Sequence, residues 1–207
     1  MSSMTARGVS SWVDYFKSGW ADFVGPEATR TNTSIALGSG AAALVGAAAL
    51  AKRRGAGGAW TTVIALMAAD LVGGVYVNNT RASIRWYERA GQGNSEHFKF
   101  AAFHGHPVLV SLADRQIGAR ENVAGWALAQ YGYMMLSTAV IRHCPTHRRS
   151  LGVALTAGGL VLDRALGSST VATWFACTYY PKLLMGHAAG SLRPDDDLNV
   201  DVFREDG

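Results

Sequence analysis

The sequence predicts an all-α fold, a polytopic transmembrane helical bundle of about 5–6 spans that follows an amphipathic interfacial helix. Three observations lead to this prediction. Uncharged stretches recur along the 207 residues, and several approach the roughly 20 apolar residues that a helix needs to cross the hydrocarbon core. Charged residues make up 16% of the chain, against about 25% in typical soluble domains. Lys and Arg gather at the ends of the apolar stretches, where interfacial anchors lie.

Composition also limits the classes of partner. The net charge is +4 and the sequence pI is about 9.3, which in a soluble domain would suggest nucleic-acid binding. Because the basic residues flank apolar stretches, they suit membrane anchoring better. We therefore expect the lipid bilayer and other membrane protein subunits as partners, and no nucleic acid. The two cysteines, Cys144 and Cys177, form no CxxC pair, so we expect free thiols.

Three segments divide the chain. Residues 1–33 form a polar and amphipathic N-terminal segment, residues 34–190 form the helical bundle, and residues 191–207 form an acidic solvent-exposed tail. Within the first segment, aromatic residues recur at helical spacing between residues 11 and 24, which predicts an amphipathic helix. Its aromatic face would lie in the lipid headgroup layer or pack on the rest of the protein. This face carries Trp12, Phe16, Trp20 and Phe23.

The first two spans form a predicted helical hairpin. Residues 34–51 carry no charge, and the basic run at residues 52–54 ends this span. The second span covers residues 57–77 and contains Asp70. Small residues recur every four positions along the first span, a pattern that lets another backbone approach closely. We therefore assign helix packing to Ser34, Gly38, Ala42 and Gly46.

Four further apolar stretches follow a polar connector rich in Arg, Trp and Tyr between residues 81 and 95. The first of the four is marginal in length and contains Pro107, so it is either a span or a re-entrant segment. The bundle therefore holds six spans, or five and one re-entrant segment. The four stretches are residues 97–113, 122–141, 151–166 and 170–186.

Positive charge predicts the orientation. With six spans, the side that holds both chain ends carries twelve Lys and Arg residues, and the opposite side carries six. Loops rich in Lys and Arg stay on the cytoplasmic side. Both ends should therefore face the cytoplasm of a bacterial plasma membrane or the matrix side of a mitochondrial inner membrane, two locations that the sequence does not distinguish.

Ionisable side chains inside the spans are the candidates for chemistry, because burying charge in a bilayer is costly. Asp70 is either a proton carrier or general acid, or the partner in an interhelical ion pair or hydrogen bond, and the pair is the favoured interpretation. The segment that begins the third stretch adds further candidates. Together the catalytic candidates are Asp70, Glu96, His104 and His106.

The histidines also suggest alternatives that involve a cofactor. A metal could use His97 and His104, which share a helix face, with Glu96 or with His143 and His147. A bis-histidine haem needs one His from each of two helices, and His104 with His187 or His143 could supply it. No spacing selects either site, so no cofactor and no metal are predicted. The favoured interpretation is that these histidines bind backbone or headgroup atoms at the bundle edge.

Asp163 and Lys182 look like a pair, but on a regular hairpin they would differ in depth by about 10 Å. We expect Lys182 to extend its ammonium to the opposite membrane interface instead. The chain contains no Walker loop, no GxSxG, no HExxH and no GxGxxG before a helix.

These features favour a non-catalytic subunit of a larger membrane complex, for example a bioenergetic one. The alternative is a small membrane enzyme that acts on a lipidic or prenyl substrate, with Asp70 as the acid and Glu96, His104 and His106 around the pocket. A third option is an electron-transfer protein that binds haem or quinone. The pocket of an enzyme would need aromatic walls, for which the candidates are Trp126, Tyr131, Tyr133 and Trp174.

Overall fold

The computed structural model describes residue 15 and residues 17–193. Within this part the chain is all-helical, as predicted, and contains no strand. The elements are α2 (Arg30–Arg53), α3 (Gly58–Val77), α4 (Arg81–Tyr87), α5 (Asn94–Phe103), α6 (His106–Gln116), α7 (Val123–His143), the short 3-10 helix η1 (Pro145–His147), α8 (Arg148–Ala165), α9 (Phe175–Tyr180) and the π-helix η2 (Pro181–Ala188).

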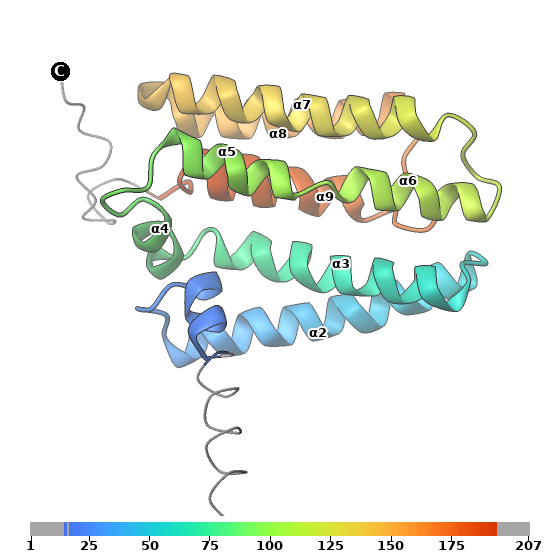
Figure 1. Ribbon diagram of the computed structural model, residues 1–207, viewed down its shortest axis with the longest axis horizontal. Coiled ribbons are helices and arrows are strands. Elements are labelled where there is room, and N and C mark those ends of the chain that lie inside the picture. Colours follow the sequence, from blue (N-terminus) through green and yellow to red (C-terminus); the bar gives the residue numbers. More distant parts are fainter. Residues whose placement is uncertain (1–14, 16, 194–207) are drawn as a thin grey trace, which may run out of the picture.

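The helices form six antiparallel rows (Figure 1). Four rows are the single helices α2, α3, α7 and α8. The fifth row is the pair α5–α6, which is broken between its two members, and the sixth is α9, which continues without a break into η2. The connections alternate between two ends of the bundle. We call the end that holds α4 and Arg193 the α4 end, since Arg193 donates to the carbonyl of Asn79 there. The opposite end, which holds residues 52–57, 117–122 and 166–174, is called the far end.

Of the described helices, α2 and α3 are by themselves long and apolar enough to cross a membrane. The helical part of the fold prediction is therefore confirmed, whereas a bundle of five or six membrane spans is not. The remaining rows are shorter or more polar. The α5–α6 row is broken into two short helices, and the continuous α9–η2 row covers only residues 175–188. Charged residues lie at both ends of α8, and α7 contains polar residues such as Gln130 and Ser137.

Local sequence explains where α2 begins and ends. Thr29 caps its N-terminus by accepting a hydrogen bond from the backbone N–H of Asn32, whose side chain accepts one from the N–H of Thr29 in return. Lys52 and Arg53 occupy the last turn, which suits the negative end of the helix dipole. Gly55 then takes a positive φ of 91°, which reverses the chain into α3.

The contact between α2 and α3 uses a row of small residues other than the predicted one. The buried residues of α2 are Ala36, Gly40, Ala47 and Ala51. A Cβ on Gly40 would lie 3.3 Å from the carbonyl oxygen of Ala69, so the two backbones approach closely there. In contrast, the predicted packing residues Ser34, Gly38, Ala42 and Gly46 are all exposed. Two members of that row, Ala42 and Gly46, lie at the edge of a groove that Ala68 and Val72 of α3 also line.

The α9–η2 row lies at the centre of the bundle and packs against α3, α7 and α8. Its aromatic residues Phe175, Tyr179 and Tyr180 are almost completely buried. Backbone hydrogen bonds over five residues, such as the one from the N–H of Ala189 to the carbonyl of Leu184, mark the π-helix. In an α-helix, residues five apart point about 140° away from each other. The wider π turn instead brings Lys182 and His187, both buried, toward the same side of the row.

The α5–α6 row breaks at His104 and Gly105. Pro107 lacks an N–H, so it cannot continue the hydrogen-bond ladder of α5 and instead occupies the first turn of α6. The row resumes in the same direction, so the stretch at residues 97–113 runs along the bundle as two short helices (Figure 1).

The described part of the N-terminal segment is helical at residue 15 and residues 17–24. Trp20 and Phe23 pack on a small core formed by Val24, Ala36 and Val77. Trp20 and Phe23 of the aromatic face therefore pack on the rest of the protein, which was one of the two expected positions. Trp12, Phe16 and the aspartates of the acidic tail lie outside the described residues. Cys144 and Cys177 are free, as expected.

A close helix contact yields a stability prediction. A Cβ on Gly159 would lie 2.6–2.7 Å from ring atoms of Tyr180, whose buried ring has no room to move. Gly159→Ala should therefore destabilise the protein by about 1–3 kcal/mol through overpacking. Gly38→Ala on exposed α2 is the control, and it should be neutral or stabilising because a Cβ there meets no atom within 4 Å. Thermal unfolding of both variants measures the difference, and equal melting temperatures would contradict this packing.

Candidate functional site

The strongest polar contact between rows joins Asp70 of α3 to Lys182 of η2. The Lys182 ammonium donates a 2.6 Å hydrogen bond to Asp70 Oδ2. The Lys182 side chain is 1% exposed, whereas that of Asp70 is 38% exposed. Gly74, one turn further along α3, provides space for the Lys182 stem, because a Cβ there would overlap its aliphatic carbons. The favoured interpretation of Asp70 as an ion-pair partner thus agrees with the geometry, whereas Lys182 does not extend to an interface as expected.

Two histidines complete what we call the central cluster: Asp70, His104, His106 and Lys182. His106 Nε2 lies 3.6 Å from Asp70 Oδ2, and the rings of His104 and His106 are 5.3 Å apart. The break in the α5–α6 row brings these two rings together, since residues two apart on an unbroken helix point about 160° away from each other. His106 Nδ1 is buried and has no hydrogen-bond partner among the described residues. The imidazole of His106 therefore places one nitrogen near the Asp70 carboxylate and leaves the other buried without a hydrogen bond.

A second group, the end cluster, lies toward the α4 end and consists of Glu88, His97, Arg142 and His187. Arg142 donates to both carboxylate oxygens of Glu88, at 2.8 and 3.4 Å. His97 Nε2 lies 3.3 Å from Glu88 Oε1, and His97 Nδ1 lies 3.1 Å from His187 Nε2. All four side chains are buried or nearly so. These contacts tie α4, α5, α7 and η2 together.

Phe100 connects the two clusters. Its ring stacks on His187 with centroids 3.7 Å apart, and its centroid lies 4.6 Å from that of His104. The carbonyl of Phe100 also accepts a hydrogen bond from His104 Nδ1 at 2.7 Å. A haem held by His104 and His187 would have to displace this ring. The geometry therefore gives the haem alternative no support at that pair.

The environment of Glu88 favours its ionised form. Burial by itself raises the pKa of the Glu88 carboxyl, but contact with His97 and the charge and hydrogen bonds of Arg142 outweigh burial and lower this pKa below its ordinary 4.5. Glu88 is thus a carboxylate that fixes the positions of a guanidinium and an imidazole.

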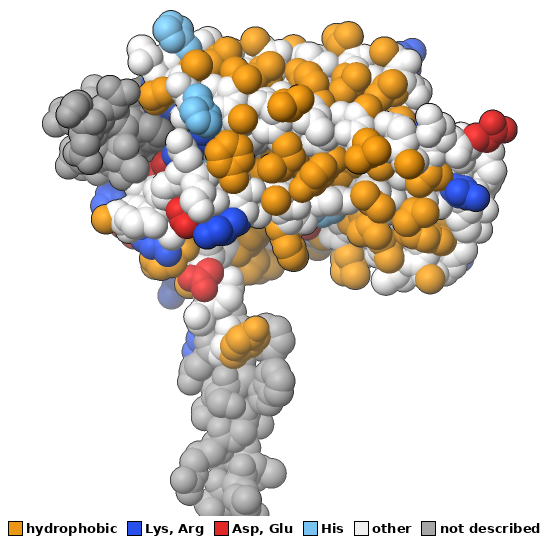
Figure 2. Space-filling view, turned by 45° about the horizontal axis from the view of Figure 1, so that its top comes forward, with side chains coloured by type: hydrophobic (Ala, Val, Ile, Leu, Met, Phe, Trp, Pro, Cys, Tyr) orange, Lys and Arg blue, Asp and Glu red, His pale blue; other side chains and the backbone are white. Residues whose placement is uncertain are grey.

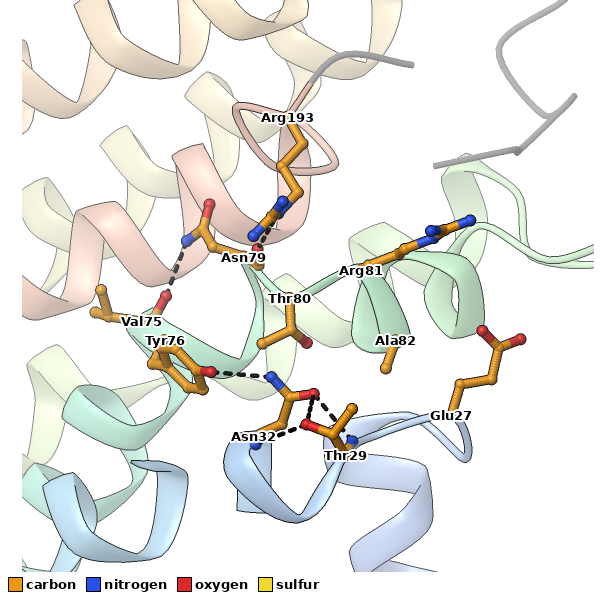
Figure 3. A pocket seen from close by; sticks show the side chains of 10 residues that line it. All are labelled: Glu27, Thr29, Asn32, Val75, Tyr76, Asn79, Thr80, Arg81, Ala82 and Arg193. Atoms are coloured by element: carbon orange, nitrogen blue, oxygen red, sulfur yellow. Dashed lines mark hydrogen bonds between the residues drawn. The ribbon is translucent and has the colours of Figure 1, made fainter. Parts of the chain in front are cut away.

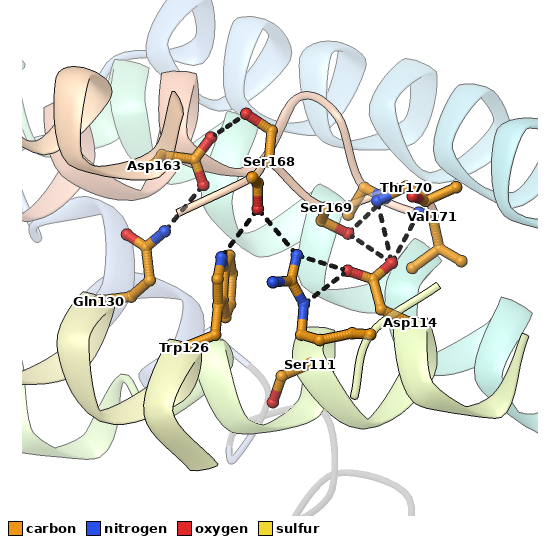
Figure 4. Close-up of polar contacts among 12 residues, drawn as sticks. Ser111, Asp114, Trp126, Gln130, Asp163, Ser168, Ser169, Thr170 and Val171 are labelled. Carbon is orange, nitrogen blue, oxygen red and sulfur yellow. Dashed lines mark hydrogen bonds and ion pairs between the residues drawn. The ribbon is translucent and has the colours of Figure 1, made fainter. Parts of the chain in front are cut away.

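The far end contains a third polar group, whose role is structural (Figure 4). Asp114 of α6 is fully buried, and its Oδ1 accepts hydrogen bonds from the Ser169 hydroxyl and from the backbone N–H groups of Thr170 and Val171 at 3.0–3.1 Å. Its Oδ2 accepts from Arg120 at 3.2 Å. With both oxygens satisfied inside the protein, Asp114 holds the loop between α8 and α9 in place.

Nearby, Asp163 also has a partner within the bundle. Its Oδ1 accepts a 2.8 Å hydrogen bond from Gln130, whose carbonyl oxygen accepts one from the Tyr180 hydroxyl. Asp163 therefore pairs with Gln130 rather than with Lys182, as the difference in depth predicted.

Several candidate residues lie outside the two clusters. Glu96 sits on the exposed first turn of α5, where it accepts hydrogen bonds from the N–H of Gly93 and from Lys99. It caps that helix and has no contact with Asp70. His143 and His147 are exposed near η1, and His143 Nδ1 is 2.8 Å from the carbonyl of Ala139. No group of three or more His, Cys, Asp or Glu side chains that could hold a metal occurs among the described residues.

The aromatic residues expected around a pocket do not line one cavity. Trp126 donates to Gly167, Tyr131 to Ala102 and Tyr133 to Leu155, each at a backbone carbonyl of another segment. These hydrogen bonds fix helix positions at different levels of the bundle.

Glu88, Arg142 and Lys182 are the site residues that sequence reasoning missed. The first two sit in segments that resemble ordinary interfacial anchors. Lys182 follows Pro181 in an otherwise apolar stretch, and an isolated charge of this kind indicates a buried partner of opposite charge.

Comparison of the chain with models of known protein families, with curated proteins and with solved structures found no match.

The buried ion pair predicts asymmetric effects of mutation. Asp70→Asn leaves the Lys182 charge buried and unpaired, which should cost about 3–5 kcal/mol of stability. Lys182→Met should cost less, because Asp70 is part-exposed and keeps His106 beside it. The double variant D70N/K182M should recover most of the loss caused by D70N. Unfolding of all three variants forms a double-mutant cycle, and strictly additive losses would contradict the pairing.

The lowered pKa of Glu88 predicts a pH dependence of stability. A carboxyl whose pKa is lower in the folded state stabilises the protein above its unfolded pKa, and this contribution is lost as the pH falls through the folded pKa. Glu88→Gln should therefore be less stable than the wild type at pH 7, and the gap should narrow as the pH falls below 4.5. Melting temperatures over a pH series measure this gap, and a constant gap would contradict the role assigned to Glu88.

Proposed function

We propose that the chain is a multi-pass membrane protein in which all six rows cross the bilayer. The observation that carries this proposal is the exposure of α2. Residues 31–51 carry no charge, and apolar side chains such as Leu37 and Val45 are 55% and 67% exposed. A helix in the core of a soluble protein would bury this surface, and an apolar face of this length is unfavourable in water. Lipid is the solvent in which it is stable.

The distribution of side chains over the surface supports the same proposal. In Figure 2, hydrophobic side chains cover the middle of the visible face and charged ones gather toward the two ends. Exposed apolar side chains recur along four different rows, and form a belt around the bundle. They include Leu37, Val45, Leu66, Leu128, Leu136, Val153 and Val161. Six crossings also bring Arg30 and Arg193 to the α4 end, which would face the cytoplasm or matrix.

Within the membrane we propose that the protein is a non-catalytic subunit of a larger complex. The small-residue row Ser34, Gly38, Ala42 and Gly46 is bare, although such rows favour close helix packing in bilayers. Ala42 and Gly46 of this row line an apolar groove of about 420 Å³, together with residues that include Ala68, Val72 and Trp174. A helix of another subunit that packs on this row would fill the groove.

A second candidate function is a membrane enzyme that acts on a lipidic or prenyl substrate. One observation favours it: the part-exposed carboxylate of Asp70 lies 3.6 Å from His106, whose Nδ1 is buried without a partner. Ionisable groups within a membrane belt mark functional sites by default. In this candidate the role predicted for Asp70 as the acid needs a preceding step, because the Lys182 ammonium at 2.6 Å favours the carboxylate and Asp70 must first accept a proton. His106 shapes the pocket, whereas Glu96 has no part because it lies on the first turn of α5.

The subunit proposal predicts that Gly38→Leu and Gly46→Leu release partner proteins. The added side chains meet no atom of the chain within 4 Å at their Cβ positions, so the purified variants should melt like the wild type. Native electrophoresis of membranes solubilised in mild detergent should show the wild type in a large assembly and the variants at lower mass. Gly132→Leu on α7, which is equally open at its Cβ, is the matched control and should stay in the assembly.

A wild-type protein that migrates alone would contradict the subunit proposal. Purification without detergent as a monodisperse protein would contradict the membrane proposal itself. If a lone protein turns over a lipid and Asp70→Asn abolishes that turnover while the fold is retained, the enzyme candidate replaces the subunit.

A further inference from the structure

A polar pocket of about 510 Å³ opens at the α4 end, between the N-terminus of α2, the C-terminal turn of α3 and the start of α4 (Figure 3). Figure 3 shows Arg193 above Asn79, whereas Arg81 extends from α4 in the direction away from Arg193; Thr29 and Asn32 lie below both. Val75, Tyr76 and Ala82 add an apolar wall. The pocket thus combines positive charge with an apolar surface at the edge of the proposed membrane belt.

The uncharged polar groups around the pocket already have partners. The Asn32 amide donates to the Tyr76 hydroxyl at 2.9 Å, and the Asn79 amide donates to the carbonyl of Val75 at 2.8 Å. The Thr29 hydroxyl donates to Asn32, and the Thr80 hydroxyl donates to the carbonyl of Val77. These groups therefore build the walls, and the recognition of a ligand falls to the two arginines.

The arginines keep donors available. Arg193 uses its Nε to bind the carbonyl of Asn79 at 3.3 Å, which leaves both terminal nitrogens of its guanidinium without a partner among the described residues. Arg81 has no ion-pair or hydrogen-bond partner among those residues. Glu27 also lines the pocket, but Arg85 lies 3.4 Å from its carboxylate and balances its charge. Guanidinium groups donate hydrogen bonds and cannot accept them. The N–H donors that remain without a partner in the pocket therefore favour an anion as the ligand.

From this geometry we infer that the pocket binds a phosphate-bearing anion, namely the phosphate headgroup of an anionic lipid. A guanidinium suits the oxygens of a phosphate, so Arg193 and Arg81 offer two separate points of attachment for an anionic headgroup, and the apolar residues Val75 and Ala82 offer a surface for its acyl chains. Basic pockets at the cytoplasmic or matrix end of membrane helices are suited to such headgroups. The lipid identity rests on the proposed membrane location, whereas phosphate recognition rests on the pocket alone.

Dioctanoyl phosphatidic acid and dioctanoylglycerol form a matched pair of probes, because they differ only in the phosphate. Added to the full chain in detergent, phosphatidic acid should raise the melting temperature with a saturable dose dependence, and dioctanoylglycerol should not. The double variant R81Q/R193Q should weaken this binding by about tenfold or more, because it removes the charged donors to the phosphate. Both residues are exposed, and the variant without ligand loses only the hydrogen bond from Arg193 to the carbonyl of Asn79, so its melting temperature should stay close to that of the wild type.

Arg53→Gln at the far end is the control for general charge, and it should bind phosphatidic acid like the wild type. Glycerol 3-phosphate separates the two sources of phosphate. If it binds as tightly as phosphatidic acid, the ligand is a soluble phosphate ester and the lipid identity is wrong. If neither phosphate binds, or if R81Q/R193Q binds as well as the wild type, the pocket proposal is overturned. Solubility without detergent would contradict the membrane proposal, yet binding of glycerol 3-phosphate would still test the pocket.

Discussion

The ion pair of Asp70 and Lys182 is the contact on which the centre of the bundle depends. A lysine that is 1% exposed in the middle of a helical row is tolerated only where a carboxylate meets it. Three irregular features make this meeting possible. Gly74 leaves space for the lysine stem, the π-helix turns Lys182 and His187 toward the same side, and the break before His106 brings its imidazole to within 3.6 Å of Asp70.

The sequence predicts well those helices whose ends are determined by local residues, and it predicts poorly those whose form is determined by contacts with other helices. Residues 34–51 and 122–141 were placed correctly within a few residues as helices, because uncharged stretches and their polar ends are local signals. The break at Gly105 and the change from α-helix to π-helix at Pro181 were not predictable in form, since a proline can kink, end or begin a helix depending on what packs against it. The buried face of α2 differs from the predicted one for a related reason. Two rows of small residues run along this helix, and only the position of α3 determines that the row with Ala36 and Gly40 is buried.

The site was partly predictable in the same sense. Asp70, His104 and His106 were recognisable as isolated ionisable groups in apolar stretches, and the structure brings them together. Their partner was hidden because a regular helix would have carried Lys182 to another depth and direction. Glu96 was selected for its proximity in sequence to the histidines, yet it caps α5. Glu88 and Arg142 lie 54 residues apart, and nothing in either segment indicates the other.

The unequal exposure within the ion pair links structure to function. Lys182 is enclosed by the protein, whereas Asp70 is 38% exposed. If the proposed bilayer surrounds the bundle, an uncovered carboxylate is unfavourable there, so a neighbouring subunit or a polar part of a substrate would lie against it. The enclosed lysine keeps the carboxylate in position whichever of the two is bound. A partner or substrate that binds at this level of the bundle would therefore contact Asp70 rather than the enclosed Lys182. The subunit and enzyme proposals differ in which of the two contacts this carboxylate.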